Sequence, residues 1–539
     1  MLRSNVHITI ALALVFSLST LACATTFWVD GTYGNDGNSG LSQEDAFATI
    51  QRGIDAATAE GDVVKVVSGT YSEAGNTNLT WSGRHITVIS SDDDPSTCVI
   101  DCNSLETGFE FPRIDEIAGG VVQGFSINGT FGGAIFLNNE LAVLSINNCL
   151  IEASDGDGIM LYRGGMTITD SQIQYCEENG LSATGDLAIT NTVFYNNGGI
   201  GAYTTTYGEQ FTSISGCQFR NNGTGLDLNV YPSGSVLVDR CYLTDNYEAG
   251  IGHEGEDATI RNCFIARNGL VGLSSAASSE TACLDIFNCT ITDNGEPYFA
   301  GWGIFCAGID LHIVNSIVWG NLGSGVGKDI TIDDYDGGEE WSTATIEYSD
   351  VGSWLARGNS EFAWGEGNIS TDPLLVTGSP LLTGASPCID SGDPVDPGSY
   401  YLGADINGDP RVLGPRVDIG ADEYTGCFPI TYSTYNDWVT MGRPACWCAP
   451  PHGSGYQCDG DGDGNTEGAL KYRVFSKDLA VMESQWKKTI EEVTDPCADF
   501  DHKPEGALKY RVFSNDLARL TANWKKKDAQ LPGDCPRWE

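Results

Sequence analysis

The sequence predicts an all-β fold in which short parallel strands coil into a solenoid. One phrase occurs eight times between residues 141 and 321: two apolar residues in alternation, a polar residue that is usually Asn, a small residue, and most often an Asn five places further on. The small residue falls at positions 149, 171, 192, 217, 241, 263, 289 and 316, so the period drifts between 21 and 27 residues. A drifting period of this size indicates a solenoid with loops of variable length. Alternation of apolar and polar residues over a few positions predicts strands and not helices.

Equivalent places in the phrase are expected to form columns along the solenoid. Inward Ile, Leu and Val stack on their equivalents one coil away, about 4.8 Å apart, and bury apolar surface worth about 25 cal/mol per Å². Unpaired Cys packs as a small apolar residue, so buried free thiols are expected at Cys149, Cys217, Cys241, Cys263 and Cys289. Asn at a tight corner can adopt left-handed angles and bond to nearby backbone, which predicts an internal Asn ladder. Its members are Asn197, Asn222, Asn246, Asn268, Asn294 and Asn321, with Ser154 and Cys176 at that place in two coils.

Residues 1–24 are predicted to be a secretion signal. Arg3 is followed by an apolar run over residues 8–21 and by the small residues of Ala22-Cys23-Ala24, which suits cleavage before Thr25. Lipidation of Cys23 is the alternative. We therefore expect a secreted, extracellular or surface-attached protein. No later run approaches the ~20 apolar residues that a membrane span needs.

Residues 25–73 are expected to cap the first coil. Ala46, Ile50, Ile54 and Ala57 fall on one face at helical spacing, which predicts a capping helix between two short strands. A solenoid needs its first coil covered, and an amphipathic helix does this.

The segments on both sides of the repeat resemble those of known secreted proteins. Val29-Asp30-Gly31, Phe47-Ala48-Thr49-Ile50, Gly61-Asp62-Val63-Val64 and Gly69-Thr70-Tyr71 resemble the entry of family-9 pectate lyases. Pieces such as Ser386-Pro387-Cys388-Ile389-Asp390 and Val417-Asp418-Ile419-Gly420-Ala421-Asp422 resemble the closing segment of bacterial secreted β-helices. The resemblance implies a right-handed parallel β-helix of the pectate-lyase-like superfamily over residues 74–367, with residues 368–425 as its C-terminal closing segment.

A Cys/Trp-rich linker, residues 426–457, leads into a duplicated tail over residues 458–539. The phrase that begins at Gly468 recurs 38 residues later, and each copy leads into a helix with matched apolar positions, so the two helices are predicted to pack on each other. Disulfides with open pairing are expected among the cysteines of an exported, loop-rich segment. These are Cys427, Cys446, Cys448, Cys458, Cys497 and Cys535.

The tail also contains the candidate metal ligands. Aspartates alternate with glycines, as hard oxygen ligands do in a calcium loop. The candidates are Asp459, Asp461, Asp463 and Asp478 in the first copy, and Asp499, Asp501 and Asp516 in the second. The pattern resembles a dockerin, which implies Ca²⁺ and a cohesin-like or cell-surface partner. The second loop departs from the dockerin pattern, because Asp501 and Asp516 are 15 residues apart where a dockerin loop spans twelve.

Seven residues of the solenoid are candidates for catalysis. Asp155 and Asp157 follow Cys149 by six and eight residues, and Glu177 and Glu178 follow Ser171 by six and seven, so the four carboxylates are expected on one turn across two coils. A glycoside hydrolase needs two carboxylates about 5 to 9.5 Å apart. The others are Arg240 as the base of a lyase, and His253 with Glu254 in an acidic loop. For each, the alternative is a solvated polar turn or, for Arg240, a side chain that covers a coil.

Composition and predicted fold together favour a protein that binds or processes extracellular polysaccharide. A stack of coils presents a long flat surface, with Tyr203, Tyr207, Tyr231, Tyr242 and Tyr247 available to stack on sugars. The alternatives are a polysaccharide lyase or glycoside hydrolase that acts on an acidic glycan, and a passive envelope or adhesion spacer. The formal charge of -45 argues against nucleic acid and anionic membranes.

Overall fold

The structure is a computed structural model of the 539-residue chain. It describes residues 24–424 except 105, 113–118, 278–281, 297–300, 324–325, 335–341, 395–402 and 413–415. In the tail it describes residues 460–461, 472, 474–488, 492–498, 500, 512, 514–527 and 531. The linker and nearly all of the predicted signal peptide, including Cys23, therefore lie outside the described residues.

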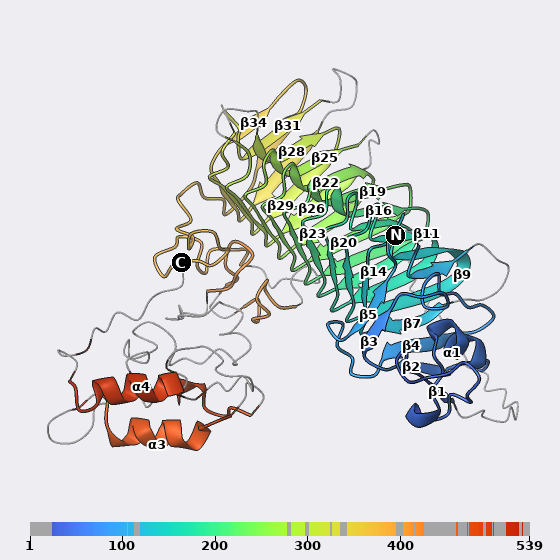
Figure 1. Cartoon of the computed structure of the whole chain (residues 1–539). Helices are drawn as coiled ribbons and strands as arrows, with labels where there is room; N and C mark the ends of the chain where they lie inside the picture. The colour runs from blue at the N-terminus through green and yellow to red at the C-terminus, as the bar shows by residue number, and fades with distance from the viewer. Residues whose placement is uncertain are drawn as a thin grey trace, which may run out of the picture.

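The described part of the solenoid consists of three ladders of parallel strands that stack along its length (Figure 1). Ladder one contains β6 (Phe109–Phe111), β13 (Leu181–Thr184), β16 (Ile200–Thr206), β19 (Thr224–Val230), β22 (Ala249–Gly255), β25 (Val271–Ala276), β28 (Trp302–Ala307), β31 (Ile330–Asp333) and β34 (Trp354–Ala356). Ladder two contains β1 (Thr26–Val29), β2 (Val63–Val66), β4 (Ile86–Ser90), β7 (Gly119–Gln123), β14 (Asp186–Thr190), β17 (Phe211–Ser215), β20 (Ser235–Asp239), β23 (Ala258–Arg261), β26 (Cys283–Phe287), β29 (Asp310–Val314), β32 (Thr343–Glu347) and β35 (Glu361–Trp364).

Ladder three is a separate sheet of short strands, and two long strands join the other ladders. Ladder three contains β3 (Gly69–Tyr71), β5 (Cys98–Asp101), β8 (Ser126–Asn128), β10 (Leu150–Glu152), β12 (Gln172–Gln174), β15 (Val193–Tyr195), β18 (Gln218–Arg220), β21 (Tyr242–Thr244), β24 (Phe264–Ala266), β27 (Thr290–Thr292), β30 (Ile317–Trp319) and β33 (Asp350–Val351). The long strands β9 (Ile135–Asn147) and β11 (Ile159–Thr169) pass from ladder one into ladder two. The predicted parallel stacking is confirmed.

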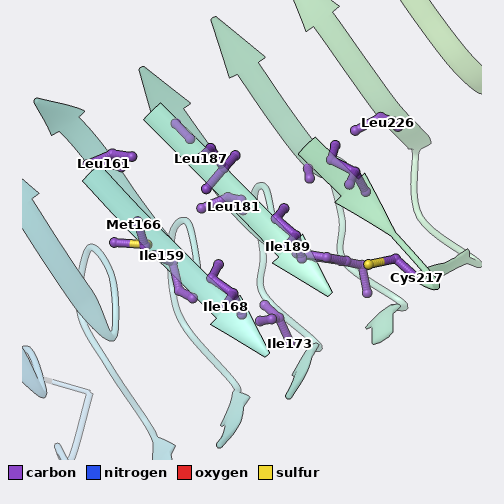
Figure 2. Close-up of a cluster of buried hydrophobic side chains, with 14 of the residues drawn as sticks. Ile159, Leu161, Met166, Ile168, Ile173, Leu181, Leu187, Ile189, Cys217 and Leu226 are labelled. Carbon is purple, nitrogen blue, oxygen red and sulfur yellow. The ribbon is translucent and has the colours of Figure 1, made fainter. Parts of the chain in front are cut away.

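Aliphatic columns fill the interior between the ladders. Ile189 pairs in register with Ile214, and the same column continues through Val238, Ile260, Ile286, Ile313 and Ile346. Figure 2 shows the inward side chains of β11, β13 and β14 gathered in this space. The five thiols of the repeat are buried and free, as predicted. Burial raises the pKa of Cys149 to about 12, so these thiols act as core side chains.

The predicted Asn ladder is present, but its backbone geometry differs from the prediction. Asn222 Nδ2 donates to Asn246 Oδ1 at 3.2 Å, and Asn246 Nδ2 donates to Asn268 Oδ1 at 2.9 Å. Left-handed angles occur instead at the residue before each ladder position, such as Asp245 (φ 59°), and at the opposite corner, such as Asn262 (φ 51°). The side chains of the ladder residues form hydrogen bonds with buried backbone groups of neighbouring coils, and this role explains why Asn occupies these positions.

The N-terminal segment contributes strands to the solenoid as well as a helix. The helix α1 (Ile50–Ala56) is shorter than the expected span from Ala46, because Phe47 forms a parallel bridge with Val29. Its buried residues Ile50, Gly53 and Ile54 pack against β1 and β2. Since β1, β2 and β4 belong to one ladder, the coils begin before residue 74, the start predicted for the solenoid.

The closing segment packs on the side of the solenoid, against the outer face of ladder three. Ile406 and Ala421 form a buried cluster with Phe264, and Leu382 and Ile419 form another with Ile317. The coils themselves continue to β35. The described residues of the closing segment therefore cover an outward column of ladder three.

The two described helices of the tail pack together as predicted. They are α3 (Ser476–Gln485) and α4 (Ser514–Asn523), and Met482 and Leu520 share one buried cluster. Lys487 N donates to Val512 O and Lys525 N donates to Val474 O, both at 2.9 Å. The two donors are 38 residues apart in the sequence, and so are the two acceptors. The two units therefore form a symmetric pair. Among the described residues no helix combines the length and hydropathy needed to cross a bilayer.

Candidate functional site

The outer face of ladder one carries polar and aromatic side chains in two columns. Side chains alternate along a strand, so every second residue of β13, β16, β19, β22 and β25 points outward. The first column contains Ser182, Tyr203, Asp227, Gly252 and Ser274; the second contains Thr184, Thr205, Asn229, Glu254 and Ala276. We call these two columns the ladder-one face.

Asp227 is a partly buried carboxylate in the middle of the ladder-one face. It lies between Tyr203 on one neighbouring strand and Gly252 on the other. A Cβ atom at position 252 would lie 3.3 Å from Asp227 Oδ1, so the glycine leaves room for the carboxylate. Asn229 Nδ2 donates to Oδ1 at 3.4 Å. Burial raises the pKa of Asp227, and the carboxylate of Glu254 raises it further. A carboxyl with a pKa raised by burial is typical of a general acid.

Glu254 supplies a second carboxylate beside Asp227. It is exposed, and it lies two residues beyond Gly252, the register partner of Asp227. The strand spacing and the rise per residue place the two Cα atoms about 8 Å apart. Both side chains point to the same side of the sheet, so their carboxyl groups can take up the separation of about 5 to 9.5 Å that hydrolysis of a glycosidic bond requires. One buried and one exposed carboxylate can divide the roles of acid and base.

His253, the candidate next to Glu254, belongs to the interior. It points inward from β22, between Leu228 and Ser275 in register, and is 4% exposed. Its Nδ1 lies 2.8 Å from Ser275 Oγ. Burial lowers the pKa of His253 to about 4. The imidazole is therefore a neutral core group at pH 7 and does not reach the ladder-one face.

Aromatic side chains border the ladder-one face. Tyr207 and Tyr231 follow β16 and β19 at one edge, and their exposed rings stack with centroids 4.5 Å apart. Tyr247 is exposed on the turn at the other edge. Tyr242, in contrast, is covered by the closing segment, where its hydroxyl lies 3.1 Å from Asn407 Oδ1. The expectation that Tyr242 is available to stack on sugars is therefore wrong.

A groove of about 930 Å³ lies between ladders one and two in the earlier coils. Tyr162, Thr184, Asp186 and Phe211 line it, and Thr184 is also part of the ladder-one face. Gln210 lines the groove as well and accepts the N–H of Tyr207 at 2.9 Å. The groove therefore continues into the aromatic edge of the ladder-one face.

The four acidic candidates of the predicted turn lie on two adjacent coils between ladders three and one. Glu177 N donates to Ser154 O and Glu178 N donates to Gly156 O, which places the two turns side by side. Asp155, Glu177 and Glu178 are exposed. Asp157 Oδ1 accepts the N–H of Asn179 at 2.9 Å, a bond between the two adjacent turns. These residues border the ladder-one face and give this edge a negative charge.

Arg240 lies at the corner between ladders two and three, with a left-handed backbone (φ 53°) at the place that Asn262 holds one coil later. Its Nε lies 3.3 Å from Asp239 Oδ2, and its Nη2 donates to Ser215 Oγ at 3.1 Å. Arg261 also contacts Asp239, at 3.1 Å. Arg240 is thus part of a local ion-pair cluster at some distance from the ladder-one face.

Three of the seven candidate calcium ligands lie among the described residues. Asp461, Asp478 and Asp516 are all fully buried. Asp478 Oδ2 accepts the N–H of Phe475 at 2.7 Å, and Asp516 Oδ1 accepts that of Phe500 at 2.6 Å. Carboxylate oxygens are the donors that Ca²⁺ prefers, so the chemistry of these side chains suits the ion, but the three do not form a group of metal ligands among the described residues. Asp459, Asp463, Asp499 and Asp501 lie outside the described residues. Cys497 is disulfide-bonded, and its partner lies outside them too, because the other described cysteines are free.

Sequence reasoning missed Asp227. The signal was present, since Asp227 is the outward residue of an alternating strand and Glu254 is the outward residue of the next. The register between these strands depends on the intervening loop, and a drifting period does not fix it.

Comparisons with known proteins agree with the fold. A model of a right handed beta helix region matches residues 61–225 and, in an overlapping match, residues 157–326. The solenoid is a right-handed parallel β-helix. No curated protein matches the sequence. The β-helix is similar to the A-module of the mannuronan C-5 epimerase AlgE6 of Azotobacter vinelandii, at 16% identity and a TM-score of 0.38, over 60% of this chain and 95% of that one.

Two lyases of known structure are also similar to the β-helix. Pectate lyase Pel9A is 14% identical with a TM-score of 0.33, over 75% of this chain and 98% of that chain. A rhamnogalacturonan lyase is 14% identical with a TM-score of 0.34, over 59% and 86%. At these identities the likeness concerns the fold alone.

Proposed function

We propose that the β-helix binds an extended polysaccharide along the ladder-one face and hydrolyses it between Asp227 and Glu254. The observation that carries this proposal is the pair of adjacent outward carboxylates, one partly buried with a raised pKa and one exposed. A polysaccharide suits this surface because both are extended and repetitive. The stacked rings of Tyr207 and Tyr231 supply an apolar platform for a sugar ring.

The chemistry follows from the different environments of the two carboxyl groups. Protonated Asp227 donates its proton to the glycosidic oxygen as the bond to that oxygen breaks. Glu254 removes a proton from a water molecule, which adds to the anomeric carbon, or attacks that carbon itself if the two groups lie at the shorter separation. In the first route Asp227 ends deprotonated and Glu254 protonated, and proton exchange with solvent restores both. In the second route the Asp227 carboxylate removes a proton from water, which hydrolyses the glycosyl ester of Glu254 and restores both groups. Each route consumes one water molecule.

The charge of this region favours a neutral glycan over a uronate. Glu254 and the acidic turn with Glu177 and Glu178 would repel a polyanion. A lyase needs a Lys or Arg base, or a cation, beside a uronate. Neither outward column contains Lys or Arg over β13, β16, β19, β22 and β25.

We further propose that the protein is exported and that its tail is a calcium-dependent tether. Support comes from the signal-like N-terminus, the duplicated units of the tail and the buried carboxylates of Asp461, Asp478 and Asp516. When bound, Ca²⁺ would neutralise the charge of the carboxylates in each copy. A cohesin-like or cell-surface protein is the proposed partner.

The binding step is tested by affinity electrophoresis of the full chain in gels that contain neutral or acidic polysaccharides. A neutral glycan is expected to retard the wild type, and the variant Tyr207→Ala/Tyr231→Ala is expected to lose at least tenfold in affinity. The control is Tyr33→Ala, which removes another exposed tyrosine far from the face. Retardation by pectate alone, or equal affinity of the double variant and the wild type, would contradict the proposal.

A further inference from the structure

A cysteine, an aspartate and a histidine come together on the outer face of ladder two. Cys283 and Asp285 lie on β26, and His312 lies on the next strand, β29. Asp285 and His312 are register partners, and Cys283 precedes Asp285 by two residues, so the three side chains point to the same side. Cys283 and Asp285 are partly buried and His312 is exposed. This site lies on a different ladder from the carboxylates of the proposed hydrolytic site.

The three donor atoms form a triangle of the size that one metal ion requires. Cys283 Sγ lies 3.6 Å from His312 Nδ1 and 3.5 Å from Asp285 Oδ1, and the last two atoms are 3.1 Å apart. Around a tetrahedral Zn²⁺, the ordinary bond lengths give about 3.6 Å for sulfur to nitrogen, about 3.6 Å for sulfur to oxygen and about 3.4 Å for nitrogen to oxygen. The observed triangle differs from these values by no more than a few tenths of an ångström.

The surroundings of the triangle are negatively charged. Asp257 Oδ1 accepts the N–H of Cys283 at 3.0 Å. Asp310 is the register partner of Cys283, and it accepts a hydrogen bond from Thr343 Oγ1 at 2.6 Å. With Asp285, three carboxylates therefore surround the thiol. A divalent cation would offset the repulsion among them and favour the thiolate.

The donor types select the metal. Ca²⁺ and Mg²⁺ take oxygen ligands, whereas a thiolate, an imidazole and a carboxylate together are a ligand set for Zn²⁺. We propose that Cys283, Asp285 and His312 bind one Zn²⁺ through Sγ, a carboxylate oxygen and Nδ1, with the fourth position open to solvent. The ion cross-links two successive coils of the β-helix.

The test is a Zn²⁺ titration of the full chain by calorimetry in excess Ca²⁺, which occupies oxygen-only sites. The tail contains other cysteines, so the readout is the difference in stoichiometry between variants. Cys283→Ser and His312→Ala are each expected to bind one equivalent less than the wild type. The matched control is His85→Ala, because His85 Nδ1 lies 3.1 Å from Glu60 Oε1 in an ion pair without a cysteine. This variant is expected to keep the wild-type stoichiometry.

Absorption of bound Co²⁺ provides a second readout, because a change in folding alone would not remove a thiolate-to-Co²⁺ band selectively. The wild type is expected to show one equivalent of thiolate-to-Co²⁺ charge-transfer absorption that Cys283→Ser lacks, with unchanged circular dichroism. Equal Zn²⁺ stoichiometry in the wild type, Cys283→Ser and His312→Ala would overturn the proposal. So would an equal loss in His85→Ala, since the effect would then not depend on the triangle.

Discussion

Replacement of Asn246 by Ala tests how strongly the internal ladder holds successive coils together. Asn246 is 1% exposed. Its Nδ2 donates to Asn268 Oδ1 at 2.9 Å and to Phe219 O at 3.1 Å. Its Oδ1 accepts from Asn222 N at 3.0 Å and from Asn222 Nδ2 at 3.2 Å. At about 1 kcal/mol net for each of these four bonds, Asn246→Ala should lower the free energy of unfolding by about 4 kcal/mol.

The assay is denaturant unfolding of the full chain, followed by circular dichroism and by tryptophan fluorescence. Asn359→Ala is the control, because the side chain of Asn359 is exposed, and we expect a change within about 0.5 kcal/mol. Asn246→Asp should destabilise nearly as much as Ala, since a carboxylate cannot donate to Asn268 Oδ1 or Phe219 O. A loss below about 1 kcal/mol for both Asn246 variants would refute the view that the ladder stabilises the stack.

Three further predictions concern titration and calcium. Burial raises the pKa of Glu423 from 4.5 to about 8, so its contribution to stability is full below about pH 4.5 and is lost as the pH rises from there to about 8. Glu423→Gln should therefore flatten the fall in thermal midpoint between about pH 4.5 and pH 8. Burial lowers the pKa of His253 from 6.5 to about 4. The free energy of unfolding should therefore fall by up to about 3 kcal/mol as the pH drops from about 6.5 to about 4. His253→Leu should remove this fall, and an unchanged pH profile in the variant would contradict the burial of the imidazole. Ca²⁺ should raise the unfolding midpoint of the tail in the full chain. Asp461→Ala should raise the Ca²⁺ concentration needed for the same rise in midpoint at least tenfold. An equal Ca²⁺ dependence in the variant and the wild type would count against a calcium loop.

The coiling of the chain could be predicted from the sequence because it depends on local patterns. The spacing of Ile189, Asn191 and Asn197 recurs in most coils, and the aliphatic residues of successive copies are buried in the same column. The left-handed positions were placed at the wrong residues, because both Asn191 and Asn197 satisfy the same compositional preference. Only the backbone of the corner distinguishes the residue that turns the chain from the residue that bonds across coils.

The sites depend on distances that the sequence does not contain. Asp227 meets Gly252 and Glu254, and Cys283 meets His312, across loops of differing length. The burial of Tyr242 results from Asn407 and its neighbours, 165 residues away along the chain. Partners that come from other coils or from the closing segment are fixed by register and packing, so single-strand patterns could not reveal them.

The most direct test of the proposed function is the release of reducing ends from neutral polysaccharides by the purified full chain. Wild type is expected to release them from at least one neutral glycan that it binds, while Asp227→Asn and Glu254→Gln each lose at least a hundredfold in rate and still bind that glycan. Glu209→Gln, which changes an exposed carboxylate on a nearby turn, should keep the wild-type rate. Release at an equal rate by Asp227→Asn, or binding without any release by the wild type, would contradict a hydrolytic site on this face.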